Sequence, residues 1–132
     1  MHEKTLEPLM LAMGDVAVPY LHYECLNKQA QTLMLLHATG LPPQLWHPIA
    51  EALARTYRVI IPYYGDHREA DAETGAVDWM ALARDLARFC NALNVTKPFV
   101  VGHSMGATVA AMSEAACGLG AAALFLIEPI FL

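Results

Sequence analysis

The chain has 132 residues, of which 56% are hydrophobic and 16% are charged, and its formal net charge is −5. That length suits one domain. Because the chain is acidic and has no cluster of lysine or arginine, we do not expect it to bind nucleic acid or an anionic membrane surface. The three cysteines are widely spaced and odd in number, which favours reduced thiols in a cytoplasmic protein.

The first two predicted strands form a hairpin. Residues 9–13 are a short apolar run, and in residues 20–26 the side chains of Leu21, Tyr23 and Cys25 share one face. Such alternation is typical of a half-exposed strand. We therefore expect the two runs to pair as an antiparallel hairpin at a sheet edge.

Strands and helices then alternate along the chain. The predicted strands are apolar on both faces, as in a parallel sheet covered on both sides, and occupy residues 32–36, 57–61, 99–101 and 122–127. The predicted helices occupy residues 43–54, 78–94 and 107–116, and a polar loop spans residues 63–76. Asp78 is a good N-cap for the second helix, in which apolar residues recur every three or four positions.

This order predicts the fold class. Alternating strands and helices indicate an α/β fold with a doubly wound, mostly parallel sheet, helices on both faces and an N-terminal antiparallel hairpin. With neither an internal repeat nor a linker, residues 1–132 are expected to form a single domain.

The sequence Gly102-His103-Ser104-Met105-Gly106 carries the strongest functional signal. It stands between a predicted strand and a predicted helix, as a nucleophile elbow requires. Side chains two residues either side of a serine in so tight a turn would collide, so both positions favour glycine. Ser104 is therefore the candidate nucleophile, at the positive end of the following helix.

With this elbow and several other segments, the chain resembles the N-terminal half of an α/β-hydrolase. The likeness follows the family's order through residues 35–40, Trp46, residues 58–62 and the elbow. It implies a serine hydrolase that acts on an ester or related small acyl substrate through an acyl-enzyme on Ser104, with no cofactor.

The resemblance also implies roles for three further residues. The backbones of Thr39 and Met105 would form the oxyanion hole, although Ala38 stands where the family usually has glycine. Glu128 follows the sixth strand, where some members carry the acid of the triad. The alternative for Glu128 is a carboxylate at the rim that faces water.

Two departures from the family follow. Tyr63-Tyr64-Gly65-Asp66-His67-Arg68 replaces the usual Asp-x-Arg-Gly-x-Gly after the fourth strand. The family's catalytic histidine comes from beyond the eighth strand, which this sequence does not reach. We therefore expect an incomplete, truncated hydrolase fold that lacks the last strands and has little or no activity by itself.

Histidines and acids elsewhere offer weaker candidates. His37 is the nearest substitute base, but in the family this position normally holds the loop through hydrogen bonds. His103 precedes the nucleophile on a sharp turn, where adjacent side chains diverge. The acids of residues 66–73 are typical of a solvated loop, and no metal is expected.

Apolar residues gather at the predicted carboxyl edge of the sheet, which favours a hydrophobic acyl or alcohol group as substrate. The candidate substrate-binding residues are Leu41, Tyr63, Tyr64, Ile130 and Phe131.

Two alternatives remain open. The same elbow serves acyl transfer, cofactor-free perhydrolysis and carbon–carbon bond hydrolysis. From another class, the chain would be a non-catalytic binding module or partner subunit, and the unpaired edge of residues 122–127 would favour a homodimer. No apolar stretch reaches the roughly 18 residues of a membrane span.

Overall fold

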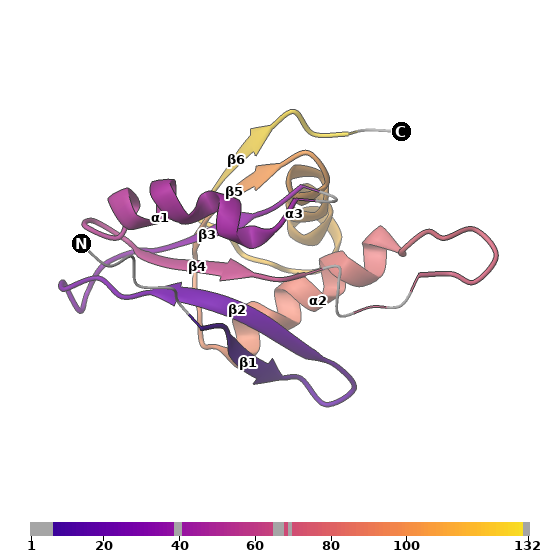
Figure 1. Cartoon of the computed structure of the whole chain (residues 1–132), viewed down its shortest axis with the longest axis horizontal. Coiled ribbons are helices and arrows are strands. Elements are labelled where there is room, and N and C mark those ends of the chain that lie inside the picture. The colour runs from indigo at the N-terminus through magenta and orange to yellow at the C-terminus, as the bar shows by residue number, and fades with distance from the viewer. Residues whose placement is uncertain (1–6, 39–40, 65–67, 69, 131–132) are drawn as a thin grey trace.

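A computed structural model describes residues 7–38, 41–64, 68 and 70–130, and these form one six-stranded sheet with helices on both faces (Figure 1). The strands are β1 (Leu9–Ala12), β2 (Ala17–Tyr23), β3 (Thr32–Leu36), β4 (Arg58–Pro62), β5 (Phe99–His103) and β6 (Ala123–Ile127). The helices are η1 (Pro43–Trp46), α1 (His47–Leu53), α2 (Trp79–Ala92) and α3 (Met105–Ala116).

The strand order in the sheet is β1-β2-β4-β3-β5-β6. β1 pairs with β2 and β2 with β4 in antiparallel fashion, while β4, β3, β5 and β6 run parallel. This confirms the predicted α/β class and the N-terminal hairpin at one edge. β6 forms the opposite edge among the described residues.

Each face of the sheet has its own apolar core, because successive strand residues point to opposite sides. α1 covers the face that carries Leu33 and Leu35, while α2 and α3 cover the face that carries Met34 and Leu36 (Figure 1). Continuous burial of residues 33–36 is why that strand reads as an unbroken apolar run.

Two elements that contain a proline differ from the predicted ones. β2 spans residues 17–23 rather than 20–26, and it includes Pro19, whose carbonyl accepts a hydrogen bond from the Tyr63 N–H at 2.8 Å. The predicted helix at residues 43–54 is divided into η1 and α1. Pro48 has no N–H to donate, so the α-helical pattern begins beside it.

Two apolar residues of the segment 43–54 lie outside the core. Leu45 is 60% exposed and Ile49 is 50% exposed, whereas Ala50 is the fully buried residue of α1. On β6, the side chains of Phe125 and Ile127 are also exposed. Among the described residues, no helix combines the length and apolar character needed to cross a membrane.

Candidate active site

Ser104 lies at the turn between β5 and α3, and its backbone is strained. Its φ of 56° and ψ of −115° lie in a region that residues with a Cβ rarely adopt. The residue is half-buried, and α3 begins at the next position. Ser104 is thus at the carboxyl end of β5 and at the positive end of the α3 dipole.

Backbone hydrogen bonds hold this turn from both sides. The Ser104 N–H donates to the carbonyl of Ile127 at 2.9 Å. The Ser104 carbonyl accepts from the N–H groups of Ala107 at 3.0 Å and Thr108 at 3.2 Å. A strained residue persists only where its surroundings over-determine it, and these bonds supply that constraint.

The two glycines of the elbow are sterically required. A Cβ added to Gly102 would lie 2.6 Å from backbone atoms of Gly106 and Ala107. A Cβ added to Gly106 would lie 2.6 Å from the carbonyl oxygen of Leu36 and 2.7 Å from Tyr64 Oη. Both positions therefore need glycine, as predicted, although the crowding at Gly106 comes from Leu36 and Tyr64 rather than from the turn itself.

The segment that follows β3 is held against the elbow by Tyr64. Its hydroxyl donates to the His37 carbonyl at 2.7 Å, and the two rings are 4.8 Å apart. His37 Nδ1 is 2.9 Å from the Ala38 carbonyl, while its buried Nε2 has no hydrogen-bond partner among the described residues. Burial raises the pKa of Tyr64 well above its ordinary value, so the hydroxyl stays protonated and donates.

The candidate pocket residues fall into three groups. Leu41 and Ile130 are 41% and 42% exposed, and Tyr63 is half-buried. Tyr64 is only 1% exposed and packs within the core, and its assignment to the substrate pocket stays a prediction. Thr39 and Phe131 lie outside the described residues.

Met105 and Glu128, the predicted oxyanion donor and acid, stand at the start of α3 and just after β6. Met105 is the first residue of α3 and is 6% exposed. Glu128 is exposed and follows β6, whose Ile127 is paired in register with His103. The φ of Glu128 is 50°, a left-handed conformation that a non-glycine residue seldom adopts.

Two other histidines are engaged away from the elbow. His47 Nδ1 is 2.7 Å from Tyr23 Oη, and its Nε2 is 3.7 Å from a carboxylate oxygen of Glu51. The Arg58 Nε–H donates to His22 Nε2 at 3.1 Å. Burial, and then the charge of Arg58, lowers the pKa of His22.

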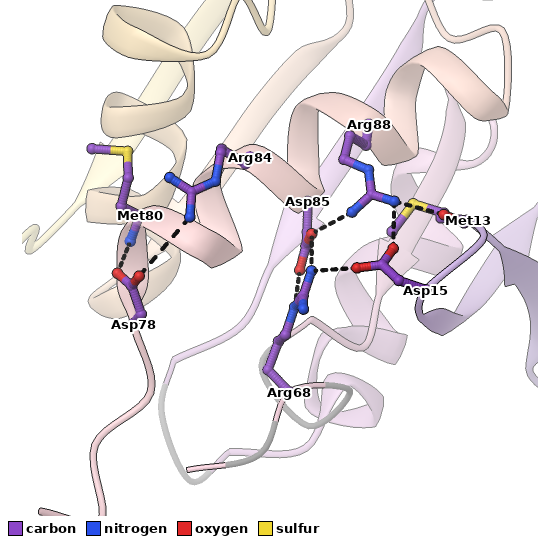
Figure 2. Close-up of polar contacts among 8 residues, drawn as sticks. All are labelled: Met13, Asp15, Arg68, Asp78, Met80, Arg84, Asp85 and Arg88. Carbon is purple, nitrogen blue, oxygen red and sulfur yellow. Dashed lines mark hydrogen bonds and ion pairs between the residues drawn. The ribbon is translucent and has the colours of Figure 1, made fainter. Parts of the chain in front are cut away.

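A charged network links Arg68, which follows β4, with α2 and the β1–β2 turn (Figure 2). Asp85 on α2 is 2% exposed and accepts two bonds from Arg68, at 2.7 and 2.8 Å. Arg88 bonds Asp85 at 3.1 Å, and it bonds Asp15 in the β1–β2 turn at 2.6 Å. Hydrogen bonding by Arg88 lowers the pKa of Asp15.

Sequence reasoning missed this network, although Asp85 gave a signal. It interrupts the apolar face of α2 between Leu82 and Phe89, where an acid is expected only if it is paired. The partner could not be identified, because Arg68 belongs to a loop whose path the sequence does not specify.

The acids of the same loop were expected to be solvated, and Asp71 has a local role. Its Oδ1 accepts from the N–H groups of Glu73 at 2.8 Å and Thr74 at 3.0 Å. These bonds lower its pKa. Asp66, His67 and Glu69 lie outside the described residues, and no cluster of three metal-ligating side chains occurs within the described part of the chain.

The model of the alpha/beta hydrolase family matches residues 33–132 of this chain. Two curated relatives are similar over shorter stretches. The magnesium-chelatase 30 kDa subunit of Rhodobacter capsulatus is 33% identical over 79 residues, which are 59% of this chain and 28% of that protein. RutD of Serratia proteamaculans (strain 568), a candidate carbamate hydrolase, is 27% identical over 93 residues, 67% of this chain and 35% of that protein.

Solved structures have the same arrangement of strands and helices. A candidate lipase, lip1, from Acinetobacter baumannii AYE gives a TM-score of 0.78 with 26% identity, over 95% of this chain and 42% of that one. A membrane phospholipase A gives a TM-score of 0.80 with 23% identity, over 96% of this chain and 41% of the phospholipase chain. The chain therefore spans less than half the length of each of these relatives.

Proposed function

The chain belongs to the alpha/beta hydrolase family, and from that premise we propose that it is a serine hydrolase acting on an ester or related acyl compound. The single observation that carries the proposal is the strained turn at Ser104, between two glycines that no other residue could replace without a collision. Strain of this kind costs stability and is found chiefly where it serves a function.

The proposed reaction has two steps. Ser104 Oγ attacks the acyl carbonyl as a base takes its proton, and the leaving alcohol departs with a proton to give the acyl-enzyme. Water then adds to the acyl carbon as the base takes its proton, the bond to Ser104 Oγ breaks, the proton returns to Ser104, and the free acid is released. Backbone N–H groups of Met105 and of the loop at Thr39 would stabilise the oxyanion, each donor contributing roughly 3 kcal/mol.

Among the described residues, we assign no histidine as the base. His37 is held between Ala38 and Tyr64, and His47 bonds Tyr23. The family resemblance puts the base beyond the eighth strand. Glu128 is proposed as the acid that orients it, since it follows β6 at the same edge of the sheet as Ser104.

The substrate is proposed to carry an apolar acyl or alcohol group. Exposed Leu41 and Ile130 stand near the carboxyl edge of the parallel strands, where ligands of open α/β sheets bind. The similarity to a candidate lipase supports an acyl ester, while the similarity to RutD makes a carbamate the second compound to test. Acyl transfer, perhydrolysis and carbon–carbon hydrolysis would use the same elbow.

The test is hydrolysis of p-nitrophenyl acetate and butyrate by the intact, folded protein, with imidazole added to supply a base. We expect activity, counted as hydrolysis above the rate that imidazole gives without protein, and we expect this activity to be lost in Ser104→Ala. Activity that survives this substitution, or no activity in a correctly folded protein with imidazole present, would overturn the proposal.

One observation favours a second candidate function. The relative with 33% identity is by name a subunit of a chelatase, which supports a non-catalytic partner subunit. The exposed side chains of Phe125 and Ile127 on β6 would suit an interface, including one between two copies of this chain. A soluble, monodisperse dimer without esterase activity would favour this alternative, and a monomer with Ser104-dependent activity would exclude the dimer.

A further inference from the structure

Thr108 is a buried polar residue in the first turn of α3, and its hydroxyl bonds a segment outside the helix. Thr108 is 6% exposed. Its Oγ1 accepts from the Ile130 N–H at 2.8 Å and donates to the Ile130 carbonyl at 2.8 Å. A hydroxyl has one proton and two lone pairs, so it can form both bonds at once.

These bonds hold one end of the segment that follows β6. Its other end is fixed where the Ile127 carbonyl accepts from the Ser104 N–H at 2.9 Å. Glu128 and Pro129 lie between the two attachment points, and we call residues 128–130 the exit turn. Both attachments are to residues of the elbow or of the first helical turn beyond it.

The exit turn needs such support because Glu128 has a φ of 50°. A left-handed conformation is unfavourable for a residue with a Cβ, and Pro129 restricts the neighbouring backbone further. Without the bond at Ile130, Glu128 would be free to relax toward an ordinary φ. The carboxylate and the Ile130 side chain would then move relative to Ser104.

We propose that Thr108 is a positioning residue, whose hydroxyl fixes the exit turn so that Glu128 and Ile130 keep their places beside Ser104. The effect of Thr108 on catalysis rests on the proposed hydrolase function. That Thr108 holds the exit turn in place does not depend on that function. Thr108 acts through the exit turn and has no contact with substrate. The two bonds to the backbone of a single residue explain why a hydroxyl occupies an otherwise apolar turn of α3.

The structural test is amide hydrogen exchange at Ile130 in Thr108→Val and Thr108→Ser. Valine has the same shape without the hydroxyl, so Ile130 should lose at least about tenfold in protection while the Leu124 amide in β6 is unchanged. Serine should keep protection within about threefold. If valine destabilises the fold, Thr108→Ala provides a second variant without the hydroxyl. Unchanged protection of Ile130 in the folded valine or alanine variant would overturn the proposal.

The functional test compares kcat and KM for p-nitrophenyl butyrate, with imidazole present, in the same variants. We expect kcat/KM to fall about tenfold in Thr108→Val and to be restored in Thr108→Ser. A wild-type protein without activity would count against the hydrolase function, whereas the exchange result would still decide whether Thr108 holds the exit turn. Equal kcat/KM in valine and serine variants of an active protein would contradict the positioning role.

Discussion

The hydroxyl of Tyr64 lies 2.7 Å from the position that a Cβ on Gly106 would occupy. The same hydroxyl bonds the His37 carbonyl at 2.7 Å, so one buried tyrosine contacts both the elbow and the segment after β3. Tyr64 thus sets the spacing between the two parts of the chain that are proposed to supply oxyanion donors.

Gly106→Ala should therefore be strongly destabilising. The new methyl group would meet the Leu36 carbonyl oxygen at 2.6 Å as well as Tyr64, and backbone cannot move aside as a side chain can. We expect the free energy of unfolding to fall by about 2–3 kcal/mol in urea denaturation. Adding Tyr64→Phe removes only one of the two collisions, so the double variant should stay destabilised; full recovery would show that the Leu36 contact is unimportant.

The strained backbone at Ser104 should lower the free energy of unfolding by a measurable amount. Ser104→Gly relieves the positive φ, while Ser104→Ala removes the hydroxyl and keeps the strain. The glycine variant should be about 1 kcal/mol more stable than the alanine variant, even though glycine gains more entropy on unfolding. Urea denaturation of the two variants measures this difference from their midpoints, provided that the dependence of the unfolding free energy on urea has the same slope in both. An alanine variant as stable as the glycine variant would mean that the turn is not strained in solution.

The ion pair between Arg68 and Asp85 should stabilise the loop after β4. Arg68→Met leaves the buried Asp85 carboxylate without its two-bond partner, and we expect a loss of about 3 kcal/mol. Arg84→Met is the matched control, because Arg84 is 3.9 Å from the exposed Asp78 and should contribute less than about 0.5 kcal/mol. Similar losses in the two variants would contradict the assignment.

His22 should make stability depend on pH. Burial lowers its pKa in the folded state, so the unfolded chain binds a proton more readily. The stabilisation is complete above the ordinary pKa of about 6.5 and declines as pH falls toward and through the lowered value. Urea unfolding at pH 8 and pH 5.5 should show a smaller loss in His22→Gln than in wild type, and equal losses would rule out this contribution.

Much of the fold could be predicted, because the strongest signals were local. Residues 32–36 form a strand with the predicted bounds, since a strand buried on both faces must be apolar throughout. Asp78 caps α2 as expected, with its side chain accepting from the Met80 N–H at 2.9 Å. Both elbow glycines were predicted from the motif itself, although only Gly102 is crowded by the turn, while Gly106 is crowded by the distant Leu36 and Tyr64.

What could not be predicted depends on contacts between distant segments. Tyr64 was assigned to the pocket because it follows a predicted strand at the carboxyl edge, whereas its burial depends on its contacts with the distant His37 and elbow. The bond from Thr108 to Ile130 spans 22 residues, and no local pattern marks it. Leu45 and Ile49 are both exposed although they are apolar, and no local pattern distinguishes them from the buried Ala50.

The central claim is that Ser104 is a nucleophile, and the chain offers an internal control because it has only two serines. Ser113 is fully buried and donates to the Ala83 carbonyl at 2.7 Å. The folded protein should be treated with a fluorophosphonate probe, with and without imidazole, and the modified residue identified by mass spectrometry. We predict a single adduct on Ser104 that forms faster with imidazole; no adduct on Ser104 under either condition would contradict the claim.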